Sequence, residues 1–412
     1  MDIDRRTQQR ASRRALLLPV YVPTALLGFA EGLLLPTLPA FALSFDVSFA
    51  VASLVLAAAG IGTLIADLPA GMLLGRVGLK PTMLLGAALV GFGTLALVAA
   101  TSVNQLIALR LLAGVGTAMW GLSRHAFITE AIDPRQRGRA ISVFGGINRI
   151  GVFGGPAIGG LIGTWFGLTA SFLAAGLLGI VALIVSWIFV QDTHVAVHSE
   201  RHVRWALVRE MVRSSWRDLS AASVAQTFAQ MIRAGRQTII PFYGLAILGL
   251  NAGQVGLIQS ASSSVDMILF IPAGYLMDRF GRKVAAVPSF AIMAVGMVLI
   301  PFTTDYLTLM AAATIIGLGN GLGTGTMMTL GADLAPPGAT GEFLGLWRLI
   351  GDTGRAGGPL AVGSLTDAVG FEYTSFILAG VGLSASLILA LLVRETRVAD
   401  DTAFGTGAPP GG

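Results

Sequence analysis

The sequence predicts an all-α membrane protein with twelve transmembrane helices, arranged as two pseudo-symmetric six-helix halves. Three observations predict this fold class: a composition poor in charge, a series of apolar segments of spanning length, and an internal repeat. Of the 412 residues, 54% are hydrophobic, 12% are charged and 54 are glycine. Soluble domains carry about 25% charged residues, and glycine is more frequent in spanning helices. This composition excludes a soluble enzyme, a disordered chain and a nucleic-acid-binding protein.

The residue types that are rare or missing exclude further classes. The chain has no Cys, which removes disulfides and thiolate metal sites. Its two lysines, Lys80 and Lys283, do not complete the Gly-Lys-Ser/Thr of a phosphate-binding loop, and both lie between apolar segments. We therefore expect no metal site, no cofactor and no enzymatic activity.

A helix that crosses a membrane needs roughly 20 mostly apolar residues. The chain offers twelve such segments, and because most connections are short, consecutive spans are expected to be antiparallel. The predicted spans of the first half are 15–43, 47–74, 81–101, 104–130, 140–164 and 168–190. Those of the second half are 218–246, 252–277, 284–304, 306–333, 343–365 and 371–393.

Three segments fall outside the predicted halves, 15–190 and 218–393. The arm, 1–14, resembles the start of a signal peptide, but the apolar run after it continues to about Leu43, so we expect an uncleaved first span. A twin-arginine export signal at Arg13-Arg14 is the alternative. In the linker, 191–217, apolar residues and arginines recur at helical spacing on opposite sides. This pattern predicts an amphipathic helix that lies in the membrane interface, and a soluble helix is the alternative. The Gly- and Pro-rich tail, 394–412, is expected to be disordered.

The charge pattern sets the predicted orientation. With the N-terminus inside, twenty of the 27 Lys and Arg fall in inside segments and none in outside loops. Cytoplasmic loops of membrane proteins carry an excess of Lys and Arg. We therefore predict a plasma-membrane protein with both termini in the cytoplasm, and the excess needs no nucleic-acid partner.

The two halves align without gaps at a constant offset of 203 residues. Pro69-Ala70-Gly71 matches Pro272-Ala273-Gly274, and Gly154-Gly155-Pro156 matches Gly357-Gly358-Pro359. Transporters with parallel repeats of this kind have an axis along the membrane normal and a substrate site between the halves near the midplane.

The loop after the eighth predicted span carries the most specific motif. It contains Gly274, Asp278, Arg279, Gly281, Arg282 and Lys283 in the pattern Gly-x-x-x-Asp-Arg-x-Gly-Arg-Lys. This resembles the loop signature of the major facilitator superfamily of secondary transporters, and the resemblance covers nearly the whole chain. The first-half copy keeps Gly71, Arg76, Gly78 and Lys80 but has Gly75 for the Asp and Leu79 for an Arg. In the family that Asp helps to latch the cytoplasmic side against span 11, and this chain lacks it.

A second motif lies in the fifth predicted span. Gly151, Gly155, Pro156, Gly159 and Gly160 resemble the antiporter motif of twelve-helix drug:proton antiporters, with Ser142 where a further glycine is expected. Small residues at this spacing also let helices approach closely, and a similar pattern in span 11 keeps plain packing as the alternative.

Ionisable residues inside spans are costly and mark functional sites. Glu31 lies near the middle of span 1, where a carboxyl group can take up and release a proton. By analogy with the family, Glu31 and Arg110 would face one central cavity, so we expect proton coupling at Glu31 with Arg110 as its partner; a static buried salt bridge is the alternative. Asp67 is either a second proton site or an inter-half bridge to Arg348.

The remaining intramembrane groups are expected to line a substrate cavity. Helical depth also pairs Arg149 with Asp266 across the second seam between the halves. The excess of arginine favours an anionic or acid-bearing substrate, unless these side chains bond backbone carbonyls or snorkel. The predicted cavity residues are Arg124, Arg149, Arg233, Arg236, Asp266, Asn320, Asp352 and Arg355.

A charge cluster is predicted at the inner surface, formed by Asp278, Arg279, Arg139 and Glu130. In the family such clusters stabilise the outward-open state and separate in the inward-open state, which makes them gating elements.

These features favour a monomeric secondary transporter that works by alternating access. Its expected partners are the lipid bilayer, a small-molecule substrate and protons, and the proton gradient is its energy source. We expect efflux of a small organic compound or drug by proton antiport. An importer of an organic anion is the main alternative, and a membrane receptor on the same fold is a remote one.

Overall fold

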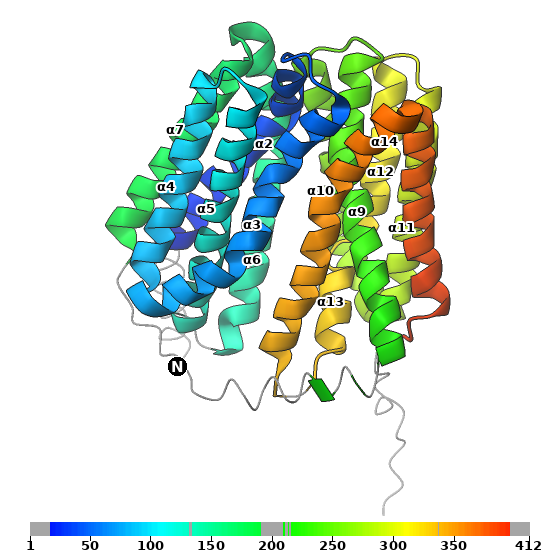
Figure 1. Cartoon of the computed structure of the whole chain (residues 1–412). Helices are drawn as coiled ribbons and strands as arrows, with labels where there is room; N and C mark the ends of the chain where they lie inside the picture. Colours follow the sequence, from blue (N-terminus) through cyan, green and yellow to red (C-terminus); the bar gives the residue numbers. More distant parts are fainter. Residues whose placement is uncertain are drawn as a thin grey trace, which may run out of the picture.

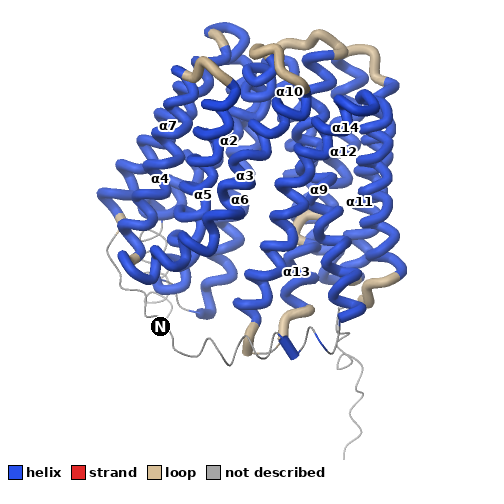
Figure 2. The backbone as a smooth tube through the Cα atoms, in the orientation of Figure 1, coloured by secondary structure: helices blue, strands red, loops and turns tan. Residues whose placement is uncertain are grey.

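The computed structural model describes residues 17–131, 134–190, 209–210, 213, 216–336 and 338–395, and this part of the chain is helical without strands (Figures 1 and 2). The N-terminal half contains a π-helical turn, η1 (Leu17–Tyr21), and a 3-10 turn, η2 (Leu97–Ala99). Its α-helices are α2 (Val22–Leu43), α3 (Phe49–Val77), α4 (Leu79–Ala96), α5 (Val103–Ala131), α6 (Pro134–Phe166) and α7 (Leu168–Phe189).

The C-terminal half has the same order of elements. It begins with α9 (Trp216–Ala246) and contains a 3-10 turn, η3 (Ile300–Phe302). Its other helices are α10 (Ala252–Phe280), α11 (Arg282–Leu299), α12 (Tyr306–Leu322), α13 (Thr326–Asp333) and α14 (Thr340–Leu391). The two halves stand side by side as helix bundles (Figure 1).

The predicted repeat is visible in the element boundaries. Adding 203 to the limits of α3, α4 and η2 gives the limits of α10, α11 and η3. The glycines at the helix junctions also correspond: Gly78 and Gly281 have φ of 91° and 107°, and Gly167 and Gly370 have φ of 91° and 84°. Positive φ is the conformation that glycine adopts without steric cost, so the repeated glycines fix the same turns in both halves.

Nine described helices are long and apolar enough to cross a membrane. One of them, α14, consists of two helices that join at Gly370, the counterpart of the α6–α7 junction. Helices α6 and α9, of 33 and 31 residues, carry more polar residues and are not among the nine. The molecule is therefore a multi-pass helical membrane protein, and the count of twelve spans stays a prediction.

Helix ends and helix contacts follow from local sequence. Asn251 and Asp305 begin α10 and α12 with reciprocal capping boxes, which satisfy backbone donors at the first turn. Hydrogen bonds from the backbone and hydroxyl of Thr308 lower the pKa of the Asp305 carboxyl group. Within the N-terminal half, α2 and α6 pack glycine against glycine: a Cβ on Gly32 would lie 2.9 Å from the Cα of Gly155.

The charged ends of the helices lie on two different faces. The face that holds the α3–α4 and α10–α11 junctions carries Arg76, Lys80, Arg279, Arg282 and Lys283, and we call it the basic face. The described loops on the opposite face hold acidic residues and no Lys or Arg. This separation is the asymmetry on which the predicted cytoplasmic orientation rests.

The halves are joined near the opposite face. Asp367 of α14 accepts hydrogen bonds from the backbone N–H groups of Phe49 and Ala50, at 3.0 and 2.8 Å, and so caps α3 of the other half. In the second seam, Ser260 of α10 donates to the carbonyl of Phe153 at 2.7 Å and accepts from the N–H of Ala157 at 2.9 Å. One seam is thus α3–α14 and the other is α6–α10.

Toward the basic face the same seams are open. Gly60 of α3 approaches Ala356 of α14, whereas a Cβ on Gly71, three turns further along α3, would meet no atom within 4 Å. Its counterpart Gly274 in α10 is equally open, and the side chain of Asp278 is 76% exposed. The described contacts between the halves therefore lie toward the opposite face, and the two bundles diverge toward the basic face (Figure 1). This arrangement corresponds to an inward-open state if the basic face is cytoplasmic.

Some expectations concern residues that the structure does not describe. The arm 1–14, most of the linker 191–217 and the tail beyond residue 395 lie outside the described residues. The same holds for the side chains of Glu130 and Arg139, so the predicted gating cluster stays a prediction.

Candidate functional site

Asp266 of α10 is a charged residue that contacts side chains from three other elements. Its carboxylate accepts hydrogen bonds from the amide of Asn320 in α12 at 2.6 Å and the hydroxyl of Thr324 at 3.2 Å. It forms ion pairs with Arg149 of α6 at 3.5 Å and Arg236 of α9 at 3.6 Å. The predicted pair of Arg149 and Asp266 is confirmed, and it crosses the seam between the halves.

Arg233 completes the cluster from one turn before Arg236 on α9. Its Nη2 donates to the carbonyl of Gly323 at 2.8 Å, and its guanidinium carbon lies 5.1 Å from the centre of the Phe290 ring. Asp266, Arg149 and Arg236 all act on it electrostatically. We call the group of Arg149, Arg233, Arg236, Asp266 and Asn320 the arginine site.

A break in the tenth predicted span lies at this site, and sequence reasoning missed it. α12 ends at Leu322 and α13 begins at Thr326, with Gly325 at φ 79° between them, whereas the matching α5 is continuous. At the break the carbonyl of Gly323 accepts hydrogen bonds from Arg233 and from the N–H and hydroxyl groups of Thr326. Discontinuous helices in transporters supply backbone groups to the binding site. The signal was the alternation of glycine at positions 317, 319, 321, 323 and 325.

On the N-terminal side, Glu31 of α2 has an exposed side chain and interacts electrostatically with Arg110 of α5. Arg110 keeps a buried Nε without a hydrogen-bond partner among the described residues. The two residues predicted for proton coupling therefore lie within electrostatic range of each other, and the side chain of Glu31 is exposed.

Asp67 does not pair with Arg348 in this state. Arg348 instead forms an ion pair with Asp352 on its own helix at 3.5 Å, although it still acts electrostatically on Asp67. Oδ1 of Asp67 is buried and has no hydrogen-bond partner in the described part of the chain. α3 and α14 diverge toward the basic face. Asp352, four residues after Arg348 on the same helix, is therefore the carboxylate that Arg348 can reach.

Two further predicted cavity residues lie near these groups. Arg124 of α5 interacts electrostatically with Arg348, and exposed Arg355 of α14 interacts with Arg233. Guanidinium groups thus surround the space between the halves from α5, α6, α9 and α14.

The antiporter-like glycines have two packing roles. Gly151, Gly155 and Gly159 face Gly28, Gly32 and Leu33 of α2, which carries Glu31. Pro156 and Gly160 face α10 of the other half, at Gly256 and Ala252. α6 therefore packs on α2, the helix that carries Glu31, through one face and on α10 of the other half through an adjacent face.

The loop motif forms a local network on the basic face. Arg282 binds Asp333 at 2.9 Å and Asp278 at 3.4 Å, and Nζ of Lys283 donates to the carbonyl of Ala390 at 2.7 Å. Arg279 donates to the hydroxyl of Tyr275. The motif thus ties α10, α11, α13 and α14 together inside the C-terminal half.

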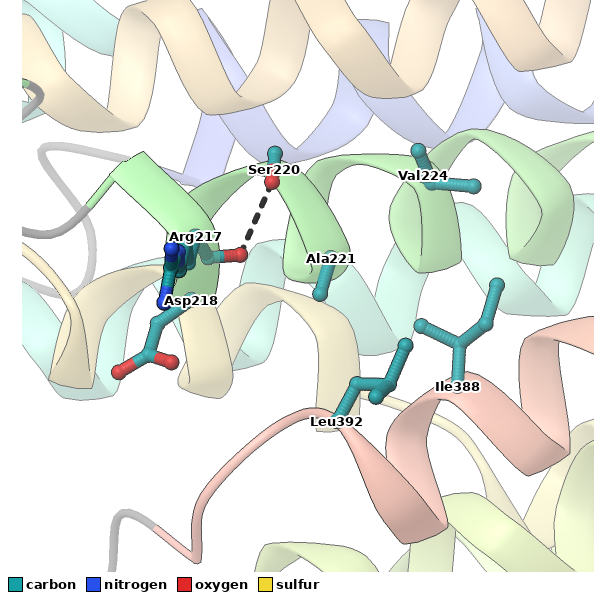
Figure 3. Close-up of a pocket in the computed structure, with 7 residues that line it drawn as sticks. All are labelled: Arg217, Asp218, Ser220, Ala221, Val224, Ile388 and Leu392. Atoms are coloured by element: carbon teal, nitrogen blue, oxygen red, sulfur yellow. Dashed lines mark hydrogen bonds between the residues drawn. The ribbon is translucent and has the colours of Figure 1, made fainter.

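A separate surface groove of about 450 Å³ lies between the start of α9 and the end of α14 (Figure 3). Its polar rim includes Ser220, whose hydroxyl donates to the carbonyl of Arg217 at 2.9 Å. The groove lies at the basic face and shares no residue with the arginine site. Its lining residues are Arg217, Asp218, Ser220, Ala221, Val224, Ile388 and Leu392.

Two repeated helix bundles, joined at one face around intramembrane charges and a broken helix, define a membrane transporter. The chain belongs to the major facilitator superfamily: the sequence model of that family matches residues 21–250 and 227–409.

Individual relatives and structures agree with this assignment. An uncharacterized MFS-type transporter of Methanocaldococcus jannaschii is 24% identical over 85% of this chain and 91% of its own. The mouse synaptic vesicular amine transporter is 22% identical over 75% of this chain and 59% of its own. The multidrug resistance protein MdtL of Escherichia coli is 23% identical over 71% of this chain and 74% of its own. Among solved structures, the nucleoside transporter NupG superposes with a TM-score of 0.76 at 12% identity, covering 92% of this chain and 100% of that chain.

Proposed function

We propose that this transporter exports a small organic compound from the cytoplasm in exchange for protons. It acts as a monomer in the plasma membrane, with both termini in the cytoplasm and the proton gradient as its energy source. The observation that carries the proposal is the placement of Glu31: an exposed carboxylate in the middle of α2, beside Arg110, in the open state.

A side chain that carries protons must have access to water, and its proton affinity must depend on the conformational state of the protein. The exposure of the Glu31 side chain supports the first condition. The second is supported by its neighbour Gly32, which packs on Gly151 and Gly155 of α6, the helix that forms one seam with the other half. Protonation of Glu31 weakens its attraction to Arg110, and α2 and α6 transmit that change to the α6–α10 seam.

The relatives give independent support for export. One is named a multidrug resistance protein and another a vesicular amine transporter, and the chain carries an antiporter-like motif in α6. An importer of an organic anion remains the second candidate because of the excess of arginine between the halves.

The test uses everted membrane vesicles with an acidic interior and a pH-sensitive dye. Lipophilic cations, neutral drugs, organic acids and sugars are added in turn. We expect one class to trigger proton efflux with the native chain and with Asp46→Asn, a matched loss of a carboxylate on an exposed loop. Glu31→Gln should abolish it. Substrate movement down its own gradient without proton movement would overturn the proposal and favour the second candidate.

A further inference from the structure

The arginine site holds more positive charge than its own acid neutralises. Arg149 and Arg236 form ion pairs with Asp266, which is the one carboxylate paired with them among the described residues. Arg233 lies within electrostatic range of the same carboxylate. Arg355 acts on Arg233 as an additional positive neighbour. Buried charges in proteins are normally paired, so this excess points to a missing negative group.

The site also has unused hydrogen-bonding atoms. The Nε atoms of Arg233 and Arg236 and Oδ1 of Asn320 are buried without a hydrogen-bond partner in the part of the chain that the structure describes. Arg236 as a whole is only 7% exposed. Because an unsatisfied buried donor costs free energy, each such atom in a native structure needs an explanation. A ligand with acceptor oxygens supplies one for the two Nε donors, whereas the amide oxygen of Asn320 is an acceptor that a carboxylate does not satisfy.

The exposed part of the arginine site, at Arg149 and Phe270, indicates which second group a ligand would have beside its acceptor oxygens. The side chain of Arg149 is 30% exposed, and its guanidinium carbon lies 4.5 Å from the centre of the Phe270 ring. Phe270 is itself 37% exposed. A cationic fork beside an accessible aromatic ring is complementary to a carboxylate attached to an apolar body.

We propose that the arginine site binds a small organic acid. Its carboxylate accepts hydrogen bonds from the guanidinium groups of Arg149, Arg233 and Arg236, and its apolar part lies against Phe270. This names the substrate class of the transporter and rests on the proposed function for its place on a transport route.

The geometry makes Asp266 a competitor of the ligand. The ligand carboxylate and Asp266 need the same guanidinium groups, since Arg149 and Arg236 lie 3.5 and 3.6 Å from Asp266. Removing the charge of Asp266 should therefore strengthen binding, while removing the charge of an arginine should weaken it. A purely structural cluster would lose binding in both cases.

The experiment measures binding to the purified full chain in detergent, by the shift of its thermal unfolding with ligand concentration. The probes are benzoate, phthalate and, as a cation of apolar character, tetraphenylphosphonium. We expect both acids to bind and the cation not to bind. Asp266→Asn should tighten benzoate binding roughly tenfold, because it removes a competing charge-assisted interaction. Arg149→Gln should weaken it by a similar factor.

Arg394→Gln is the matched control, because it removes an arginine that is 87% exposed and remote from the site, and it should bind benzoate like the native chain. Arg149→Gln should fold, because Asp266 keeps its hydrogen bonds to Asn320 and Thr324. Arg236→Lys, which keeps a charge but loses the fork, is the second variant and should also weaken binding. Failure of the acids to bind, or loss of binding in Asp266→Asn, would overturn the proposal.

The two proposals fail separately. The binding measurement has no membrane and no gradient, so Glu31→Gln should still bind benzoate while losing proton efflux. If Glu31→Gln keeps coupled export, the proposed function fails and the ligand assignment stands. If benzoate binding is unaffected by Arg149→Gln and Arg236→Lys, the ligand assignment fails and proton coupling stands.

Discussion

The contact of Gly32 with Gly151 and Gly155 decides how closely α2 and α6 approach each other. Small residues allow helix backbones to meet in a membrane, where no hydrophobic force drives helix association. Gly32 is next to Glu31 in the sequence, so the close packing of α2 on α6 and the proposed proton site lie in the same turn of α2.

Gly32→Ala should destabilise the protein by about 1–3 kcal/mol, because overpacking forces backbones apart. The added Cβ would lie 2.9 Å from the Cα of Gly155 and would also meet the carbonyl oxygen of Gly151. Thermal unfolding in detergent measures the effect. The control is Gly357→Ala in α14, where a Cβ meets no atom within 4 Å and stability should stay the same or rise slightly. Equal stability of both variants would contradict the close-packing account.

At the residue scale, sequence reasoning predicted one inter-half pair correctly and missed the partner of another. Helical depth matched Arg149 to Asp266, and the two are 3.5 Å apart. The same argument matched Asp67 to Arg348, which binds Asp352 instead. Depth is a property of each helix, but the separation of two helices depends on the conformational state, which the sequence does not encode. The i, i+4 partner is available in every state.

At the scale of elements, the break between α12 and α13 distinguishes the two halves. The equivalent α5 is continuous, so the break is not needed by the fold itself. It places the carbonyl of Gly323 against Arg233 and the hydroxyl of Thr324 against Asp266. The C-terminal half thus carries the more elaborate polar site, while the N-terminal half carries Glu31 and Arg110.

Gly325→Ala should destabilise the break by about 1–2 kcal/mol, because Gly325 has φ 79° and an L-residue is disfavoured there. Gly345→Ala in α14 is the control, since its Cβ would lie in open space and its φ is not positive. Thermal unfolding compares the two. If Gly325→Ala were as stable as Gly345→Ala, the left-handed turn would not be required.

The helix boundaries were predictable because two signals agreed, namely apolar runs of spanning length and glycines at repeated junctions. The break was not predictable in the same way, since the hydropathy of 306–333 continues through it. The interrupted helix keeps its apolar composition, and its alternating glycines continue at 321, 323 and 325, where the matching segment of α5 has Ala118, Trp120 and Leu122.

At the scale of the whole molecule, the two seams explain how one repeat can move against the other. Each seam is held near the opposite face. Asp367 of α14 binds the start of α3 in one seam, and Ser260 of α10 binds the backbone of α6 in the other. Each is open near the basic face, at Gly71 and Gly274. Under the proposed function, closure of the basic face brings Asp67 toward Arg348 and separates the contacts at the opposite face, as expected for two repeats that rock against each other.

A reversible cross-link across the α3–α14 seam tests this account most directly. The chain has no Cys, and a Cβ on Gly60 would lie 3.9 Å from the Cβ of Ala356, close to the separation found in disulfides. The measurement is proton-coupled export in vesicles by the double variant Gly60→Cys and Ala356→Cys, before and after reduction. The account predicts that the oxidised protein is inactive, held open at the basic face, and that reduction restores export. Export at the same rate by the fully oxidised protein would contradict it.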